Sequence, residues 1–148
     1  MNVEKIIKTD KVLALPARTM IHFALVNNKI NEQFALGLKP FEISEQQFNV
    51  LRILRGQKDR PMNLSGINER MITKMSNTTR LVDKLILKGY VQRWTCESNR
   101  RKVEILITTE GKAILMKIDK VIEDVEDKIL KNFSEKELKE LNQLLDKF

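Results

Sequence analysis

The sequence is poor in the residues from which small catalytic and metal sites are built. Its 148 residues include one cysteine, Cys96, and one histidine, His22. A single cysteine excludes an intramolecular disulfide and any zinc site made of several cysteines, and a single histidine excludes most metal centres and catalytic triads. The sequence also has no glycine-rich phosphate loop and no nucleophile with a matching base. It therefore predicts a protein that is not an enzyme and that uses no metal or other cofactor.

Long apolar runs and aromatic residues are also scarce. No stretch approaches the roughly 18 unbroken apolar residues that a membrane span needs, and charged residues occur throughout the first ten positions, where a signal peptide would be apolar. Hydrophobic residues still make up 42% of the chain, which is enough to form a core. These features are typical of a cytoplasmic globular protein with one domain.

Positive charge is in excess, and one part of the chain carries it. The formal net charge is +7, yet residues 52–102 contain thirteen bases and four acids, whereas residues 1–51 are nearly neutral and residues 103–148 are acidic. A local excess of this size favours a polyanionic partner over an ordinary solvated surface. We therefore expect residues 52–102 to face a nucleic acid.

Apolar periodicity and capping residues predict a mainly α-helical fold with one small β-hairpin. A short helix is expected near Val3, and a long one over residues 17–38, opened by Pro16 and ended by Gly37 and Pro40. Further helices are expected from the capping box Ser44/Gln47 to Gly56, from Asn63 to Arg70, from Thr73 or Ser76 to Lys88, from Glu110 to Ile129, and after the capping box Ser134/Glu137. Residues 90–95 and 102–108 predict the two strands of the hairpin, with a basic tip between them.

The order of helix, short helix, helix and basic hairpin is that of a winged helix-turn-helix. Within this order the sequence resembles the MarR family of bacterial transcriptional regulators. The resemblance covers residues 41–113 and rests on five short segments: FNVLRIL (48–54), SNTTRLVDKL (76–85), KGYVQR (88–93), NRR (99–101) and ITTEG (107–111). It implies a DNA-binding unit over residues 41–111, flanked by dimerisation helices over residues 1–40 and 112–148.

The resemblance also implies a function. Members of the family are sequence-specific regulators, more often repressors, that bind duplex DNA as homodimers on near-palindromic operators. Small aromatic effectors often bind between the first long helix and the DNA-binding unit. No residue of this sequence identifies such an effector, and we interpret His22, which lies among apolar residues of that helix, as a core or interface histidine.

Helical geometry selects the residues expected to contact DNA. If Met75, Thr79, Val82 and Ile86 face inward, the opposite side of the helix points outward. Near the helix start, Ser76 and Asn77 are expected to read base edges, although Ser76 is equally suited to capping the helix. Bases along the helix and just before it are expected to hold phosphates, with ordinary surface the competing interpretation of Lys84. The expected set is Lys74, Ser76, Asn77, Thr78, Arg80 and Lys84.

The hairpin tip contributes a second expected contact, through Asn99, Arg100 and Arg101. The resemblance implies that Arg100 enters the minor groove and that Arg101 supports it. The family's wing usually reads Asp-x-x-Asp-Arg-Arg, and here Cys96 and Asn99 replace the two acids, so the usual ion pairs with the arginines cannot form. We therefore expect a looser wing, and we do not interpret Cys96 as a redox sensor.

The turn before the expected recognition helix also departs from the family. Ile72 stands where glycine is frequent, and Asn68 stands where a small apolar residue is common. A turn that is longer or differently shaped than average is the expected consequence.

An RNA-binding winged helix, or a nucleic-acid-binding module without a regulatory role, is the alternative function. RNA readers usually display aromatic platforms on which bases stack. Aromatic residues are only 5% of this chain, and Trp94 is the sole exposed candidate for such a platform, so duplex DNA is favoured.

Overall fold

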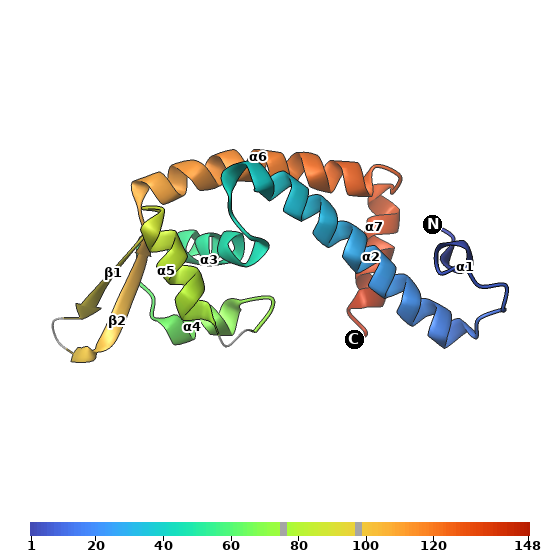
Figure 1. The fold of residues 1–148 in the computed structure, drawn as a ribbon, viewed down its shortest axis with the longest axis horizontal. Helices are drawn as coiled ribbons and strands as arrows, with labels where there is room; N and C mark the ends of the chain where they lie inside the picture. The colour runs from blue at the N-terminus through green and yellow to red at the C-terminus, as the bar shows by residue number, and fades with distance from the viewer. Residues whose placement is uncertain (75–76, 97–98) are drawn as a thin grey trace.

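The structure is a computed structural model that describes residues 1–74, 77–96 and 99–148, with only the backbone of residues 96 and 99–102. Its elements are α1 (Val3–Ile6), α2 (Leu15–Leu38), the 3₁₀ helix η1 (Lys39–Phe41), α3 (Glu45–Gly56), α4 (Leu64–Arg70), α5 (Thr78–Leu87), β1 (Val91–Cys96), β2 (Asn99–Ile107), α6 (Thr109–Leu130) and α7 (Glu135–Leu145). The predicted fold class, mainly α with one small hairpin, is confirmed (Figure 1).

The starts of α3 and α7 lie where their capping boxes predict them. Helix α5, in contrast, begins at Thr78, after Asn77, and not after Thr73 or Ser76 as predicted. The side chain of Ser44 accepts a hydrogen bond from the backbone N–H of Gln47, whose own side chain accepts from the backbone N–H of Ser44. Ser134 and Glu137 form the same reciprocal pair at the start of α7. These bonds satisfy N–H groups that the first helical turn cannot pair internally. The local sequence is therefore sufficient to fix both helix starts.

One hydrophobic core lies between α3, α4, α5, the hairpin and the first half of α6. Its fully buried side chains are Leu38, Val50, Leu51, Leu54, Ile67, Val82, Leu85, Ile105, Leu115 and Ile118. Gly111 lets α6 begin directly against the hairpin, because a Cβ atom at this position would lie 2.1 Å from the carbonyl oxygen of Tyr90. The core therefore fixes α6 relative to the winged-helix elements.

Gly37 has a different role from the one predicted. Helix α2 continues through Gly37 to Leu38 before η1 begins, so Gly37 does not end the helix. A Cβ atom here would lie 3.2 Å from Cγ2 of Val125, which places Gly37 directly against α6. The sequence shows the glycine but not the helix that passes beside it.

The two strands of the hairpin are antiparallel; β1 has the predicted length, whereas β2 begins three residues earlier than the sequence predicts. Partners run from Val91 with Ile107 to Thr95 with Val103, after which Cys96 pairs with Asn99. This shift leaves residues 100–102 as an irregular stretch of β2 near the tip. Met62 forms an isolated antiparallel bridge with Ile105, so the segment before α4 borders the outer edge of the hairpin.

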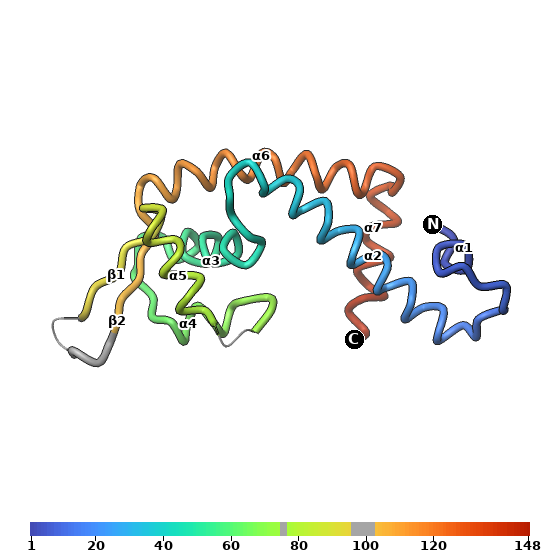
Figure 2. Tube along the Cα trace, in the orientation of Figure 1, coloured from blue at the N-terminus to red at the C-terminus, as the bar shows by residue number. Residues whose placement is uncertain are grey.

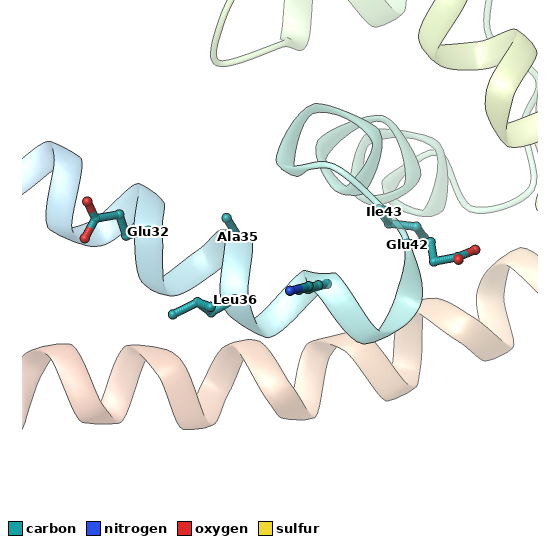
Figure 3. A pocket seen from close by; sticks show the side chains of 6 residues that line it. Glu32, Ala35, Leu36, Glu42 and Ile43 are labelled. Atoms are coloured by element: carbon teal, nitrogen blue, oxygen red, sulfur yellow. The ribbon is translucent and has the colours of Figure 1, made fainter.

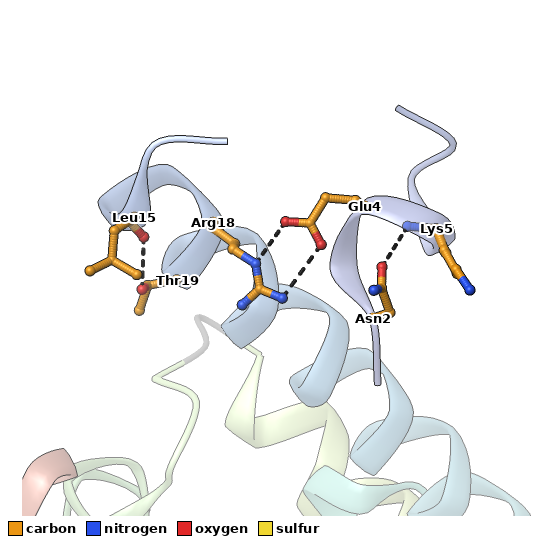
Figure 4. A network of polar contacts seen from close by, with 6 residues as sticks. All are labelled: Asn2, Glu4, Lys5, Leu15, Arg18 and Thr19. Atoms are coloured by element: carbon orange, nitrogen blue, oxygen red, sulfur yellow. Dashed lines mark hydrogen bonds and ion pairs between the residues drawn. The ribbon is translucent and has the colours of Figure 1, made fainter. Parts of the chain in front are cut away.

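The molecule is elongated, with the winged-helix elements at one end and α1, α7 and both chain termini at the other (Figures 1 and 2). Helix α1 is tied to α2 by an ion pair in which Nε of Arg18 lies 2.7 Å from Oε1 of Glu4 (Figure 4). The Phe148 ring meets the Phe23 ring of α2 edge to face, with 5.5 Å between centroids. These contacts lie outside the hydrophobic core, and Val3 of α1 is the one fully buried residue at this end among those described.

Candidate nucleic-acid interface

The phase of α5 decides which of its side chains reach the surface. Thr78, Val82 and Leu85 form its buried face, and Thr79 is exposed. The prediction that Thr79 points inward is therefore wrong. The prediction that Thr78 contacts DNA through its side chain is also corrected, because Thr78 is only 7% exposed. Thr78 is therefore the buried residue and Thr79 the exposed one, the reverse of the prediction.

A polar contact inside the helix-turn-helix explains this phase. The hydroxyl of Thr78 donates to Oδ1 of Asn68 on α4, at 2.9 Å. Asn68, where a small apolar residue was expected, thus gives the buried threonine a hydrogen-bond partner, as an interior hydroxyl requires. The turn from Met71 to Asn77 is seven residues long, against three or four in a typical helix-turn-helix. That the turn is longer or differently shaped than the family average stays a prediction, because residues 75 and 76 lie outside the described residues.

Arg80 and Lys84 lie on the exposed side of α5, as predicted, and Leu87 continues that side at the end of the helix. Lys74 is also exposed, just before the helix. Among the described residues none of these three bases has a carboxylate within ion-pair distance (N···O ≤ 4.0 Å). Other bases of the unit are paired: Arg55 with Asp119, Lys88 with Glu42 and Arg93 with Asp83. Unpaired positive charge therefore lies on α5 and in the turn before it. Arg52, Lys58, Arg60 and Arg70, elsewhere in the unit, likewise have no ion pair among the described residues.

Several predicted contact residues, or their side chains, lie outside the part of the chain that the structure describes. Ser76 lies outside the described residues, as does its neighbour Met75. The backbone of Asn99, Arg100 and Arg101 forms the first part of β2. The structure does not describe the side chains of these three residues or of Cys96. Their roles remain predictions.

Comparison with known proteins matches the same winged-helix elements to a known family. The sequence model of the MarR family matches residues 43–103, which include α3, α4, α5 and most of the hairpin. The chain is 29% identical over 135 residues to the multiple antibiotic resistance protein MarR of Escherichia coli (strain K12), with 90% of each chain covered. It is 33% identical over 108 residues to the HTH-type transcriptional regulator PecS of Dickeya dadantii (strain 3937), with 71% of this chain and 64% of PecS covered.

The chain belongs to the MarR family. The whole length takes part in the structural match, since a crystal structure of a mutant E. coli MarR complexed with operator DNA superposes with a TM-score of 0.76. That match covers 99% of this chain and 98% of the other at 26% identity. PecS is named as a transcriptional regulator, and neither its name nor that of the E. coli protein is that of an enzyme.

Asn77 directly precedes α5 of this MarR-family chain. Its Oδ1 atom is buried and has no hydrogen-bond partner among the residues that the structure describes. A bidentate bond to adenine uses both the oxygen and the nitrogen of a carboxamide. Asn77 can make that bond only if its side chain turns outward, so its predicted role requires a rotation about its side-chain bonds.

A contact that the sequence analysis missed links α5 to the wing. Nη1 of Arg93 on β1 lies 2.7 Å from Oδ1 of Asp83. Asp83 is the only acid on α5, and Arg93 belongs to the segment that carries the MarR resemblance. The signal was the lone acid in a basic helix, but its partner becomes visible only once the hairpin is placed.

A polar cleft of about 280 Å³ lies between α2, α3 and the turn before α5. Four carboxamides line it, from Asn27, Asn31, Gln46 and Asn49, and none has a side-chain hydrogen bond within the described residues. The guanidinium of Arg52, also in the lining, lies 5.6 Å from the centre of the Phe48 ring. The cleft therefore offers hydrogen-bonding groups and one cation beside aromatic surface.

A second hollow, along the end of α2, lacks this convergence. Its lining includes Glu32, Leu36 and Glu42, and Figure 3 shows the two carboxylates pointing away from each other. Small-molecule sites usually bring a few polar groups together around one volume. This hollow is therefore a surface depression.

Two other kinds of site were sought within the described residues. They contain no group of three or more His, Cys, Asp or Glu side chains that could hold a metal ion. They also contain no helix of sufficient length and apolarity to cross a membrane.

Proposed function

We propose that the protein is a transcriptional repressor that binds duplex DNA as a homodimer, in the cytoplasm, with α5 in the major groove. The observation that carries this proposal is the exposed, unpaired side of α5, where Arg80 and Lys84 lie within the most basic part of the chain. A helix with such a side can enter the major groove and hold the phosphates on either side. The similarity to a MarR structure complexed with operator DNA supports the same arrangement.

Residues 41–111 form the proposed DNA-binding unit. Arg80, Lys84 and Lys74 hold phosphates in this proposal, and Asn77 and Ser76 read base edges. Arg100 enters the minor groove with Arg101 and Asn99 beside it. Each phosphate that a base neutralises contributes roughly 0.9 to the slope of log affinity against log salt concentration. The proposal therefore predicts strongly salt-dependent binding.

Residues 1–40 and 112–148 form the proposed dimerisation layer. Large apolar side chains on α2 and α7 and beside them are exposed in the single chain, namely Leu15, Met20, Phe23, Val26, Leu144, Leu145 and Phe148. Contiguous exposed apolar surface usually marks an interface. A two-fold dimer would place two α5 helices roughly 34 to 36 Å apart, which suits a near-palindromic operator. Sedimentation as a 17.3 kDa species at micromolar concentration would contradict this layer's role.

The polar cleft is the proposed effector site. A small aromatic acid suits its lining, because a ring can lie against Phe34 and a carboxylate can bind Arg52. Met71 and Ile72 of the turn before α5 also line the cleft, so an occupant would shift that turn relative to α2. Release of DNA follows if the shift changes the spacing of the two α5 helices.

The test of the proposed function is a genome-wide selection of duplex fragments bound by the protein at near-physiological salt. Enrichment of a near-palindromic sequence supports the proposal, and an output without a shared sequence contradicts it. Binding to RNA is compared at equal salt, and stronger binding to RNA than to the selected duplex would favour the RNA-binding alternative. The Arg80→Ala variant should select the same sequence more weakly.

A further inference from the structure

The ion pair between Asp83 and Arg93 occupies a distinctive place in the winged-helix unit. It is the one polar side-chain contact between α5 and the hairpin within the described part of the chain. The side chains of Asp83 and Arg93 are 46% and 40% exposed, respectively. An exposed pair adds little to overall stability. Its position relative to the wing is therefore the more informative property.

Arg93 lies where the hairpin leaves the core. Its register partner is Ile105, which is fully buried, and Val91, two residues earlier on the same face, is also buried. Towards the tip, Thr95 is exposed and Val103 only half-buried. At the same level, β2 is held by the backbone bridge between Ile105 and Met62. The ion pair ties β1 at the point from which the rest of the wing projects.

We infer that Asp83 is a positioning residue, which fixes the angle of the wing relative to α5 by holding Arg93. This inference rests on the proposed function, since the angle matters when α5 and the wing bind one DNA duplex together. A carboxylate on the basic side of a DNA-binding helix repels phosphates. Asp83 thus weakens general attraction to DNA while it aligns the two contacts that a specific site requires.

These two effects are separable by comparing two DNA molecules. The probes are a duplex selected by the wild-type protein and a random duplex of equal length, each titrated over a range of salt concentrations. Asp83→Asn should lower the ratio of the selected to the random affinity about fivefold, the scale of one exposed ion pair. Its affinity for the random duplex should stay equal or rise, because Arg93 becomes free to bind phosphate. Arg93→Gln should also lower the ratio.

Glu4→Gln provides a matched control. It breaks an arginine–carboxylate pair with the same 2.7 Å separation, and it changes the net charge equally, but it lies between α1 and α2. The control should leave the ratio of affinities unchanged. Because α1 and α2 belong to the proposed dimerisation layer, the dimer dissociation constant of the control is measured as well. With that constant unchanged, a loss of the ratio in Glu4→Gln as large as in Asp83→Asn would overturn the inference, because net charge would then explain both.

The position of the wing is measured without DNA. Trp94, the only tryptophan, follows Arg93 directly, so its fluorescence anisotropy reports local motion of β1. Asp83→Asn should lower this anisotropy and speed amide hydrogen exchange in β1 and β2, with exchange in α3 and the melting temperature unchanged. The reversed pair, Asp83→Arg with Arg93→Glu, should restore the affinity ratio to within about twofold of wild type, since it keeps the net charge and the attraction.

The outcomes distinguish this inference from the proposed function. If the wild-type protein selects no duplex, the proposed function fails, while anisotropy and hydrogen exchange still test whether Asp83 holds the wing. If a duplex is selected but Asp83→Asn and Arg93→Gln keep the wild-type ratio, the positioning role is refuted. A reversed pair no better than the single variants would refute it as well.

Discussion

The two ends of the molecule are built in opposite ways. Between Leu38 and Ile122, apolar side chains form one closed core, whereas outside this range Val3 is the one fully buried residue among those described. The helices near the termini expose large apolar residues instead, as Met20 on α2 and Leu144 on α7 illustrate. The winged-helix end is thus complete in one chain, while the other end has apolar surface that a second copy would cover.

Truncation of one apolar side chain at each end gives the largest expected contrast. Leu51→Ala should lower the free energy of unfolding by about 2 to 5 kcal/mol at any protein concentration, because Leu51 is fully buried. Phe23→Ala should instead change little in a dilute monomer and shift the dimer dissociation constant. Chemical denaturation at several protein concentrations, with sedimentation, measures both. If both variants lost the same free energy of unfolding at every protein concentration, the two ends would not differ in the way described.

The junction between the hairpin and α6 tests how tightly the complete end is packed. Gly111→Ala should cost about 3 kcal/mol, since its Cβ would overlap the carbonyl of Tyr90, which belongs to the backbone and cannot rotate away. Gly56→Ala is the control, because nothing lies within 4 Å of its added Cβ. Thermal unfolding should show a clear decrease for the first variant and no decrease for the second.

Charge also differs between the two ends, since the winged-helix end contains the basic residues 52–102 and the other end does not. DNA-binding measurements test whether this difference matters for function. Arg80→Ala should lower the salt slope by about one unit on selected and random duplexes alike, as expected for a phosphate contact. Lys117→Ala removes an equally exposed base from α6 and should leave the slope unchanged. An unchanged slope for Arg80→Ala would exclude Arg80 from the DNA contact.

The smallest expected effect concerns α1. A hydrogen bond from Arg18, assisted by a backbone hydrogen bond, lowers the pKa of Glu4 below its ordinary value. Because the folded pKa is the lower one, the contact stabilises α1 at neutral pH and is lost as the pH falls through that lowered pKa. Hydrogen exchange should show α1 opening in acid before α3 does. Glu4→Gln should abolish this pH dependence, and an unaltered dependence would assign it to another group.

Local chemistry explains the parts of the fold that the sequence predicted well. The helix starts after Ser44, Asn63 and Ser134 depend on side chains bonding to N–H groups two or three residues away. The hairpin was located by its β-rich runs, but the earlier start of β2 and the register shift near the tip were not predicted. A register depends on partners across the hairpin and is therefore less visible in a linear pattern.

In the candidate site, too, the features set by local sequence were predicted and those set by distant residues were not. The sequence identified the basic section, the winged helix-turn-helix order and the exposure of Arg80 and Lys84. It assigned Thr78 and Thr79 the wrong way round, because the two neighbours are chemically identical. The choice depends on Asn68, a residue of another helix that bonds only one of them.

The sequence by itself determined where the charge, the capping-box starts of α3 and α7 and the winged-helix order lie, because these features depend on residue type and on neighbours along the chain. Tertiary structure alone decided which face of α5 is buried, why Gly37 is small, and that Asp83 holds Arg93. Each of these depends on an atom from a different element, so its energy exists only once the elements are packed together.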